Sequence, residues 1–146
     1  MMTMLYKLAW SLVRSDADAQ DAVQQALLRC WERRQHIRPD AIRTYFHPDA
    51  VICWHCSNER FTVEEFIRAN CEYPGSWDGE MERMEQTENR IITVTHVYPT
   101  DRSLSFHVTS FFHLVNDKII TLDEYWADDA PSPAWRQEMH IGRPIR

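Results

Sequence analysis

Glycine is scarce in this sequence, which has only three glycines among its 146 residues. The loops that cradle nucleotide phosphates need several glycines at close spacing, because the backbone must approach the phosphate without a side chain in the way. We therefore expect no phosphate-binding loop. A Ser-His-Asp order and a paired-carboxylate motif are missing as well, so the sequence presents no standard hydrolase pattern.

Positive charge and long apolar runs are also scarce. The net charge is −6 and the isoelectric point is about 5.6. Nucleic-acid binding relies on clustered lysines and arginines, so we expect no direct nucleic-acid partner. The stretch 29–43 is a local exception, because it carries five arginines beside Glu32 and Asp40. No apolar run approaches the ~18 residues that a membrane span needs, so we expect no membrane partner.

We expect no secretion signal at the start of this sequence. Lys7 interrupts the first apolar stretch, and no small-residue cleavage site follows it. These features predict a cytoplasmic protein. In a reducing cytoplasm we expect free thiols at all four cysteines: Cys30, Cys53, Cys56 and Cys71.

The spacing of apolar residues predicts helices in the first third of the chain. Residues 5–13 and 19–31 both repeat at helical spacing. Pro39 stands where a short third helix can begin. Further along, Thr62 and Glu65 form a capping box that opens another helix, with Val63, Phe66 and Ile67 on its apolar side.

The spacing becomes extended after Pro48. The segment 49–56 has the pattern of a strand, and after a turn at 73–77 the chain continues as consecutive antiparallel strands separated by turn residues, at 80–87, 90–98, 103–115 and 118–126. Helices followed by a strand meander predict an α+β fold, in which a strongly bent antiparallel sheet packs on the N-terminal helices and leaves a cavity at its open end. The tail from Asp128 has no clear period, so we expect it on the surface or on a partner subunit.

Several motifs of this chain, in their order and spacing, resemble the NTF2-like (SnoaL-like) superfamily. The motifs are 45–51 (YFHPDAV), the helix 61–69, Ser110-Phe111-Phe112, 117–120 (DKII) and 123–126 (DEYW). The resemblance implies a cone-shaped domain over about residues 16–146, with its first long helix starting near residue 18. It also implies a homodimer through the outer face of the sheet, and a function set by the residues that line the cone.

An N-terminal segment, about residues 4–34, resembles the start of region 2 of extracytoplasmic-function sigma factors. The matching stretches are 5–9 (LYKLA) and 17–31 (ADAQDAVQQALLRCW). This resemblance implies an extra N-terminal helix at 1–15 and a contact with RNA polymerase. The parts of that family that recognise and melt promoters have no counterpart here, so the second matching helix can equally be the first long helix of the cone.

Strand parity predicts which side chains face the inside of the cone. Ile52 and Trp54 share one face of their strand. The inward sets of the other two strands are Val108, Ser110 and Phe112, and Leu122, Glu124 and Trp126. Glu124 is the only ionisable group among them, so it is the candidate acid or base; the alternative is a buried structural acid bonded to Ser110 or Trp54. Tyr73 and Trp77 are expected at the rim of the pocket.

The resemblance to NTF2-like proteins allows a test for ketosteroid isomerase activity. The three catalytic positions of that enzyme fall on Trp54, Ser110 and approximately Cys30. None of them keeps the carboxylate or tyrosine that the chemistry requires. We therefore expect this chain to lack that activity.

The run Cys53-Trp54-His55-Cys56 invites a metal-binding interpretation, but its spacing speaks against one. On a strand Cys56 points away from Cys53 and His55, and no second ligand pair with zinc spacing is present. We expect no metal site and no cofactor. Strand parity is opposite to that of Ser110 at His107 and Phe111, so we expect both side chains on the outer face of the sheet.

Three hypotheses about function follow. The first is a pocket that binds a small apolar molecule, with Trp54, Ser110, Phe112, Trp126, Tyr73 and Trp77 around the ligand and Glu124 as the catalytic group of an isomerase- or cyclase-type enzyme. The second is a regulatory protein that contacts RNA polymerase through its N-terminal segment. The third is a dimeric scaffold whose aromatic residues, including six tryptophans, fill the cone completely.

Overall fold

A computed structural model describes residues 39–146. Three short helices and six strands follow one another in the order α3 (Pro39–Arg43), β1 (Phe46–Trp54), β2 (Glu59–Phe61), α4 (Val63–Cys71), β3 (Trp77–Gln86), β4 (Arg90–Pro99), β5 (Phe106–Val115), β6 (Lys118–Asp128) and α5 (Ala134–Glu138). The predictions that fall on residues 1–38 lie outside the described residues; they are the first two helices, the sigma-like segment, the extra helix at 1–15 and the free thiol of Cys30.

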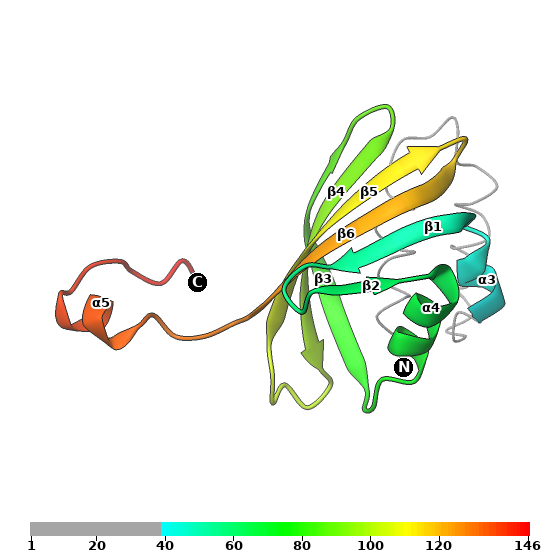
Figure 1. Ribbon diagram of the computed structural model, residues 1–146. Helices are drawn as coiled ribbons and strands as arrows, with labels where there is room; N and C mark the ends of the chain where they lie inside the picture. The colour runs from blue at the N-terminus through cyan, green and yellow to red at the C-terminus, as the bar shows by residue number, and fades with distance from the viewer. Residues whose placement is uncertain (1–38) are drawn as a thin grey trace.

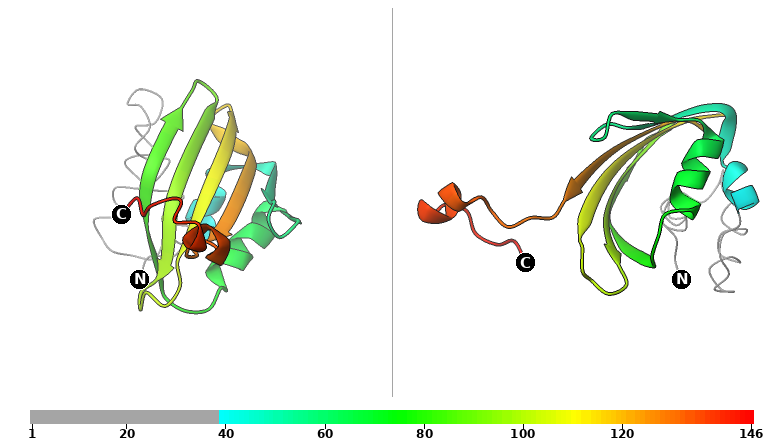
Figure 2. Two further views of the ribbon diagram at one scale, coloured as in Figure 1. Left: turned by 90° about the vertical axis from the view of Figure 1, so that its left-hand side faces the viewer. Right: turned by 60° about the horizontal axis from the view of Figure 1, so that its bottom comes forward.

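The six strands form one sheet in the order β2-β1-β6-β5-β4-β3. The sheet curves strongly, and α3 and α4 lie on its concave side (Figures 1 and 2). The α+β class and the bent sheet are confirmed. The boundaries of the predicted strands agree with the observed ones within about three residues, whereas β2 and α5, of three and five residues, were not predicted.

The prediction of an antiparallel sheet is wrong at one pairing, because β1 and β6 pair in parallel. The chain leaves β1 and passes through β2 and α4 to the far edge of the sheet. It then returns strand by strand, so that β6 arrives beside β1 pointing in the same direction. This central pairing sets Ile52 opposite Leu122, Cys53 opposite Asp123 and Trp54 opposite Glu124.

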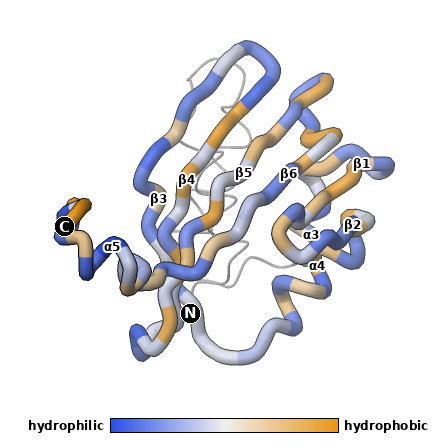
Figure 3. Tube along the Cα trace, turned by 60° about the vertical axis from the view of Figure 1, so that its left-hand side comes forward, coloured by the Kyte–Doolittle hydropathy of each residue, from blue (hydrophilic) through white to orange (hydrophobic). Residues whose placement is uncertain are grey.

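The inner face of the sheet carries the core, as strand parity predicts. Ile52, Phe112 and Leu122 lie side by side across β1, β5 and β6 and are at most 1% exposed. Figure 3 shows apolar and polar residues alternating along the strands, which is the pattern of a sheet with one covered face. The residues packed from the helix side are Ile42, Val63, Phe66 and Ile67.

Helix α4 begins where the sequence predicts. The Thr62 hydroxyl accepts a hydrogen bond from the backbone N–H of Glu65, and the Glu65 carboxylate accepts one from the backbone N–H of Thr62. This reciprocal capping box satisfies two backbone donors that a helix start leaves without partners. It fixes the start of α4 so that Val63, Phe66 and Ile67 face the sheet.

The C-terminal tail leaves the body of the sheet after β6. It carries α5 away from the other elements and turns back at its end (Figures 1 and 2). No residue of α5 is buried, and Trp135 is 57% exposed. Arg146 nevertheless forms an ion pair with Glu82 of β3. Among residues 39–146, no helix is long and apolar enough to cross a membrane.

Candidate functional site

A cavity lies at the end of the sheet where β1 and β6 finish. It encloses about 360 Å³, which is within the range of small-molecule sites. All six strands contribute to its wall, together with the β1–β2 turn and the segment after α4. The described residues that line it are Trp54, Cys56, Ser57, Glu59, Tyr73, Trp77, Val97, Phe106, Trp126 and Asp128.

Ring contacts hold most of this wall together. The Trp54 ring lies 6.3 Å from that of Trp126, and the Trp77 ring lies 5.3 Å from Tyr73 and 5.8 Å from Phe106, measured between centroids. Tilted and edge-to-face pairs at these separations are favourable. The wall is therefore formed before any ligand arrives.

The rim turn at 73–77 anchors one wall. The indole Nε1 of Trp77 donates a hydrogen bond of 2.9 Å to the carbonyl of Pro74. Gly75 has a φ of +89°, a conformation that L side chains rarely adopt, and an added Cβ would lie 3.4 Å from Nε1 of Trp77. Glycine at this position thus lets the turn fold back onto the tryptophan.

The seven site residues predicted from the sequence separate into two groups. Four of them, Trp54, Tyr73, Trp77 and Trp126, line the cavity. The other three, Ser110, Phe112 and Glu124, face the same side of the sheet but do not line the cavity. They lie deeper and are 4%, 1% and 5% exposed. Sequence parity did not point to Val97, Phe106 or Asp128.

Glu124 lies one step deeper along β6 than Trp126. Its carboxylate accepts hydrogen bonds from the Ser110 hydroxyl at 3.0 Å and from the Trp126 indole N–H at 3.2 Å. Burial raises the pKa of Glu124, and these hydrogen bonds, together with the nearby Trp54 indole, offset part of that rise. Glu124 therefore joins β5 to β6 and fixes the orientation of one cavity wall.

The indole Nε1 of Trp54 differs from that of Trp126 in its hydrogen bonding. It is buried and, among the described residues, it is the one buried side-chain polar atom without a hydrogen bond of normal geometry. It nevertheless lies close enough to Glu124 to lower the pKa of that carboxyl. Trp54 thus has a donor for which the described residues provide no regular acceptor.

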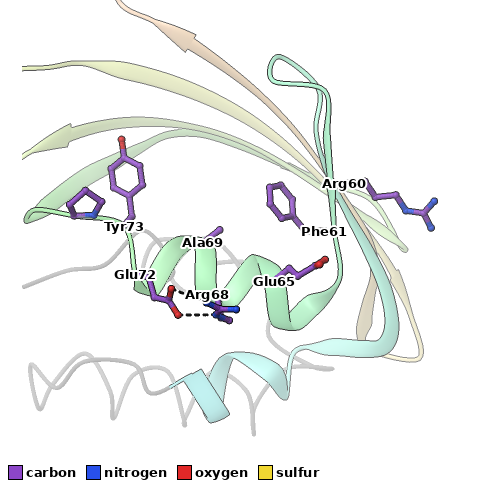
Figure 4. Close-up of a pocket in the computed structure, with 8 residues that line it drawn as sticks. Arg60, Phe61, Glu65, Arg68, Ala69, Glu72 and Tyr73 are labelled. Atoms are coloured by element: carbon purple, nitrogen blue, oxygen red, sulfur yellow. Dashed lines mark hydrogen bonds and ion pairs between the residues drawn. The ribbon is translucent and has the colours of Figure 1, made fainter.

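A second, more open pocket runs along α4 (Figure 4). It encloses about 480 Å³ and shares Tyr73 with the first. Half of its lining residues are charged, and an Arg68–Glu72 ion pair spans one turn of the helix on its edge. Exposed pairs of this kind contribute little energy, and this lining holds two aromatic residues where the first cavity holds five. The first cavity is therefore the stronger candidate site.

One group of side chains on the outer face of the sheet has metal-binding donors. Cys53, His55 and Asp123 each offer one donor atom, and these atoms lie within 4.8 Å of one another. Cys56 is not part of the group, as strand parity predicts. The third donor, Asp123, comes from β6, which local spacing in the sequence could not place beside Cys53.

His107 is also on the outer face, between two carboxylates. Its Nδ1 contacts Asp129, its Nε2 lies 3.3 Å from Glu82, and the His96 ring stacks on it at 4.9 Å. Burial lowers the pKa of His107, but the two carboxylates outweigh this effect, and the pKa is raised above the ordinary 6.5.

We expect this raised pKa to make stability depend on pH. A raised folded-state pKa stabilises the protein fully below 6.5, and this contribution is lost as the pH rises through the folded-state pKa. The stability advantage of the native protein over His107→Gln should therefore shrink between about pH 6 and about pH 9. Urea unfolding of both proteins at each of these pH values measures the advantage. An advantage that is constant or grows with pH contradicts the prediction.

Comparison with known proteins agrees with the fold. The profile of the SnoaL-like domain matches residues 24–122. A candidate ketosteroid isomerase from Kribbella flavida has a similar structure, with a TM-score of 0.65 and 16% identity over 87% of this chain and 91% of that one. An NTF-2-like protein of unknown function from Burkholderia xenovorans has a TM-score of 0.58 and 20% identity over 73% and 82% of the two chains.

A third similar structure is an LEH-like epoxide hydrolase from M. tuberculosis. Its TM-score is 0.53, with 12% identity over 86% of this chain and 84% of that one. No curated protein matches the chain. At these identities the similarities establish the fold alone. Since the profile spans more than half of the sequence and the sheet has the expected architecture, the chain belongs to the SnoaL-like domain family.

Proposed function

We propose that the protein binds a small, largely apolar molecule in the cavity at the end of the curved sheet. One observation carries this proposal: Trp54, Trp77 and Trp126, from three different strands, converge with Tyr73 and Phe106 on one space of about 360 Å³. A preformed apolar wall of this kind binds a ligand without the cost of ordering it first.

The polar groups of the cavity support binding of a ligand with one polar end. Cys56, Ser57, Glu59 and Asp128 all lie among the lining residues, and all four are exposed. The apolar body of a ligand would contact the rings while its polar group remained at this rim. Such a division gives orientation as well as affinity.

Glu124 acts in this proposal as a positioning residue. Its hydrogen bonds to Ser110 and Trp126 hold the Trp126 ring against the cavity. An isomerase- or cyclase-type reaction with Glu124 as acid or base is the second candidate. It is favoured by the burial that raises the pKa of this carboxyl. That reaction requires the ligand to pass Trp126 and reach the layer below it.

The other two hypotheses from the sequence have less support. Contact with RNA polymerase depends on residues 4–34, which lie outside the described residues. A scaffold with a filled cone does not account for the cavity. We include a homodimer through the outer face in the proposal, because Phe111 and Tyr125 form an edge-to-face pair there and are 39% and 46% exposed.

The test compares two tryptophans that differ in position. Trp77→Ala removes a wall of the cavity, whereas Trp135→Ala removes an exposed ring on α5. We expect indole and 2-naphthol to bind the native protein, and Trp77→Ala to weaken binding at least about tenfold, or ~1.4 kcal/mol. Trp135→Ala should leave the affinity unchanged. Isothermal titration calorimetry measures all three proteins.

Two results would contradict this proposal. The first is that neither probe binds the native protein at millimolar concentration. The second is that Trp135→Ala weakens binding as much as Trp77→Ala. The Trp77→Phe variant keeps an apolar ring in place and should retain most of the affinity, which separates loss of the wall from loss of the fold.

A further inference from the structure

We propose that the protein binds a divalent transition-metal ion of the zinc class through Cys53, His55 and Asp123 on the outer face of the sheet. The site is separate from the ligand cavity, because it uses the opposite face of the same strands. Cys53 and Asp123 each neighbour an inward residue in the sequence, Trp54 and Glu124, and successive side chains of a strand point to opposite faces.

The parallel pairing of β1 and β6 brings the three residues together. Cys53 and Asp123 are direct partners in the register of the two strands. His55 lies two residues beyond Cys53, on the same face. Its backbone N–H donates a 3.0 Å hydrogen bond to the carbonyl of Glu124, which continues the ladder past the last residue of β1. The backbone therefore fixes all three positions.

The donor atoms are nearly at coordinating separations. His55 Nε2 and Asp123 Oδ1 are 2.7 Å apart, and all three donors lie within 4.8 Å of one another. In a tetrahedral zinc site with bonds of about 2.0–2.3 Å, the donors are about 3.3–3.8 Å apart. If the side chains rotate so that the donor atoms shift by about 1 Å, the donors reach these separations without any movement of the strands.

The His55 ring is already held in one plane. The Tyr125 ring stacks on it with centroids 4.4 Å apart and planes only 4° from parallel. Neighbours that fix the orientation of a ligating imidazole increase metal affinity. On binding, the Cys53 thiol releases its proton to solvent, and His55 and Asp123 exchange their mutual hydrogen bond for bonds to the ion.

The donor set indicates which ions fit. One thiolate, one imidazole and one carboxylate favour Zn²⁺ or Co²⁺ over Mg²⁺ and Ca²⁺, which prefer oxygen ligands alone. In the single chain the side chains of His55 and Asp123 are 40% and 38% exposed, so an ion can reach them from solvent before the outer faces of two chains associate. Three protein ligands also leave at least one coordination position open on the outer face.

The test uses Co²⁺ as a spectroscopic probe with the full chain. We expect one Co²⁺ per chain, with the near-ultraviolet charge-transfer band of a thiolate–cobalt bond, and displacement of Co²⁺ by Zn²⁺. Cys53→Ser should abolish the band and weaken Zn²⁺ binding at least about tenfold, because even the loss of an outer-shell partner costs that much. His55→Ala and Asp123→Asn should weaken binding similarly.

The other cysteines provide matched controls. Cys56 is three residues away but outside the group, and Cys71 is on α4. The triple variant Cys30→Ser, Cys56→Ser, Cys71→Ser keeps Cys53 as its one thiol and should retain the band. Loss of the band in that variant overturns the proposal, as does a native protein that binds no Co²⁺ or Zn²⁺. Circular dichroism confirms that each variant is folded.

Discussion

Replacing Phe112 with alanine is expected to lower the free energy of unfolding by about 3–5 kcal/mol. Phe112 is 1% exposed and lies between Ile91 and Leu122 on the inner face of the sheet. The substitution removes a ring from a packed layer, and the strands around it cannot close the space. Natural domains have only about 5–15 kcal/mol of stability, so this variant should be marginal at body temperature.

The neighbouring Phe111 is the matched control for Phe112. It has the same side chain on the same strand but points to the outer face, where it is 39% exposed. We expect Phe111→Ala to cost about 1 kcal/mol or less in the isolated chain. Urea unfolding of both variants measures the difference. Equal losses would show that the assignment of inner and outer faces on β5 is wrong.

Replacing Glu124 with alanine is expected to destabilise the protein by about 3 kcal/mol. The substitution leaves the buried Ser110 hydroxyl and the part-buried Trp126 indole N–H without their acceptor, and each such loss in a buried setting costs about 1–3 kcal/mol. We also expect the affinity for an apolar probe to fall, because the Trp126 wall loses its anchor. Unfolding and calorimetric titration of the same sample measure both effects.

Glu124→Gln distinguishes a positioning role of this residue, which needs only hydrogen bonds, from an acid or base role, which needs the carboxyl group. The glutamine oxygen can accept the hydrogen bond from Trp126, and its amide can donate to the Ser110 hydroxyl, since a hydroxyl also accepts. We therefore expect a loss of stability of about 1 kcal/mol or less and nearly unchanged probe binding. A loss as large as that of alanine would show that the site requires the carboxyl group itself.

The faces of the central strands were predictable from the sequence because they depend only on local alternation. Ile52 and Trp54, Ser110 and Phe112 face inward as predicted, since the irregularities of β1 and β5 occur outside these stretches, between 46 and 51 and between 113 and 114. The capping box of α4 was predictable for the same reason: both of its partners are three residues apart.

Features that depend on distant segments were not predictable in this way. Local spacing does not reveal that β6 lies beside β1 in parallel, and therefore could not bring Asp123 to Cys53 and His55. Nor does parity tell how deep an inward residue lies. Glu124 and Trp126 share a face, yet only the residue nearer the end of β6 lines the cavity. Depth follows from the curvature of the sheet.

The parallel pairing of β1 with β6 also has a consequence for the order of folding. Strands β3 to β6 pair with their sequence neighbours and can assemble locally. Strand β1 pairs with its neighbour β2 on one edge, but its other edge must wait for β6, which follows it only after β2 to β5. Contacts between such distant segments slow folding. On the ribosome, the edge of β1 that pairs with β6 should therefore stay unpaired until β6 emerges, and this is the interval in which a chaperone would have most to bind.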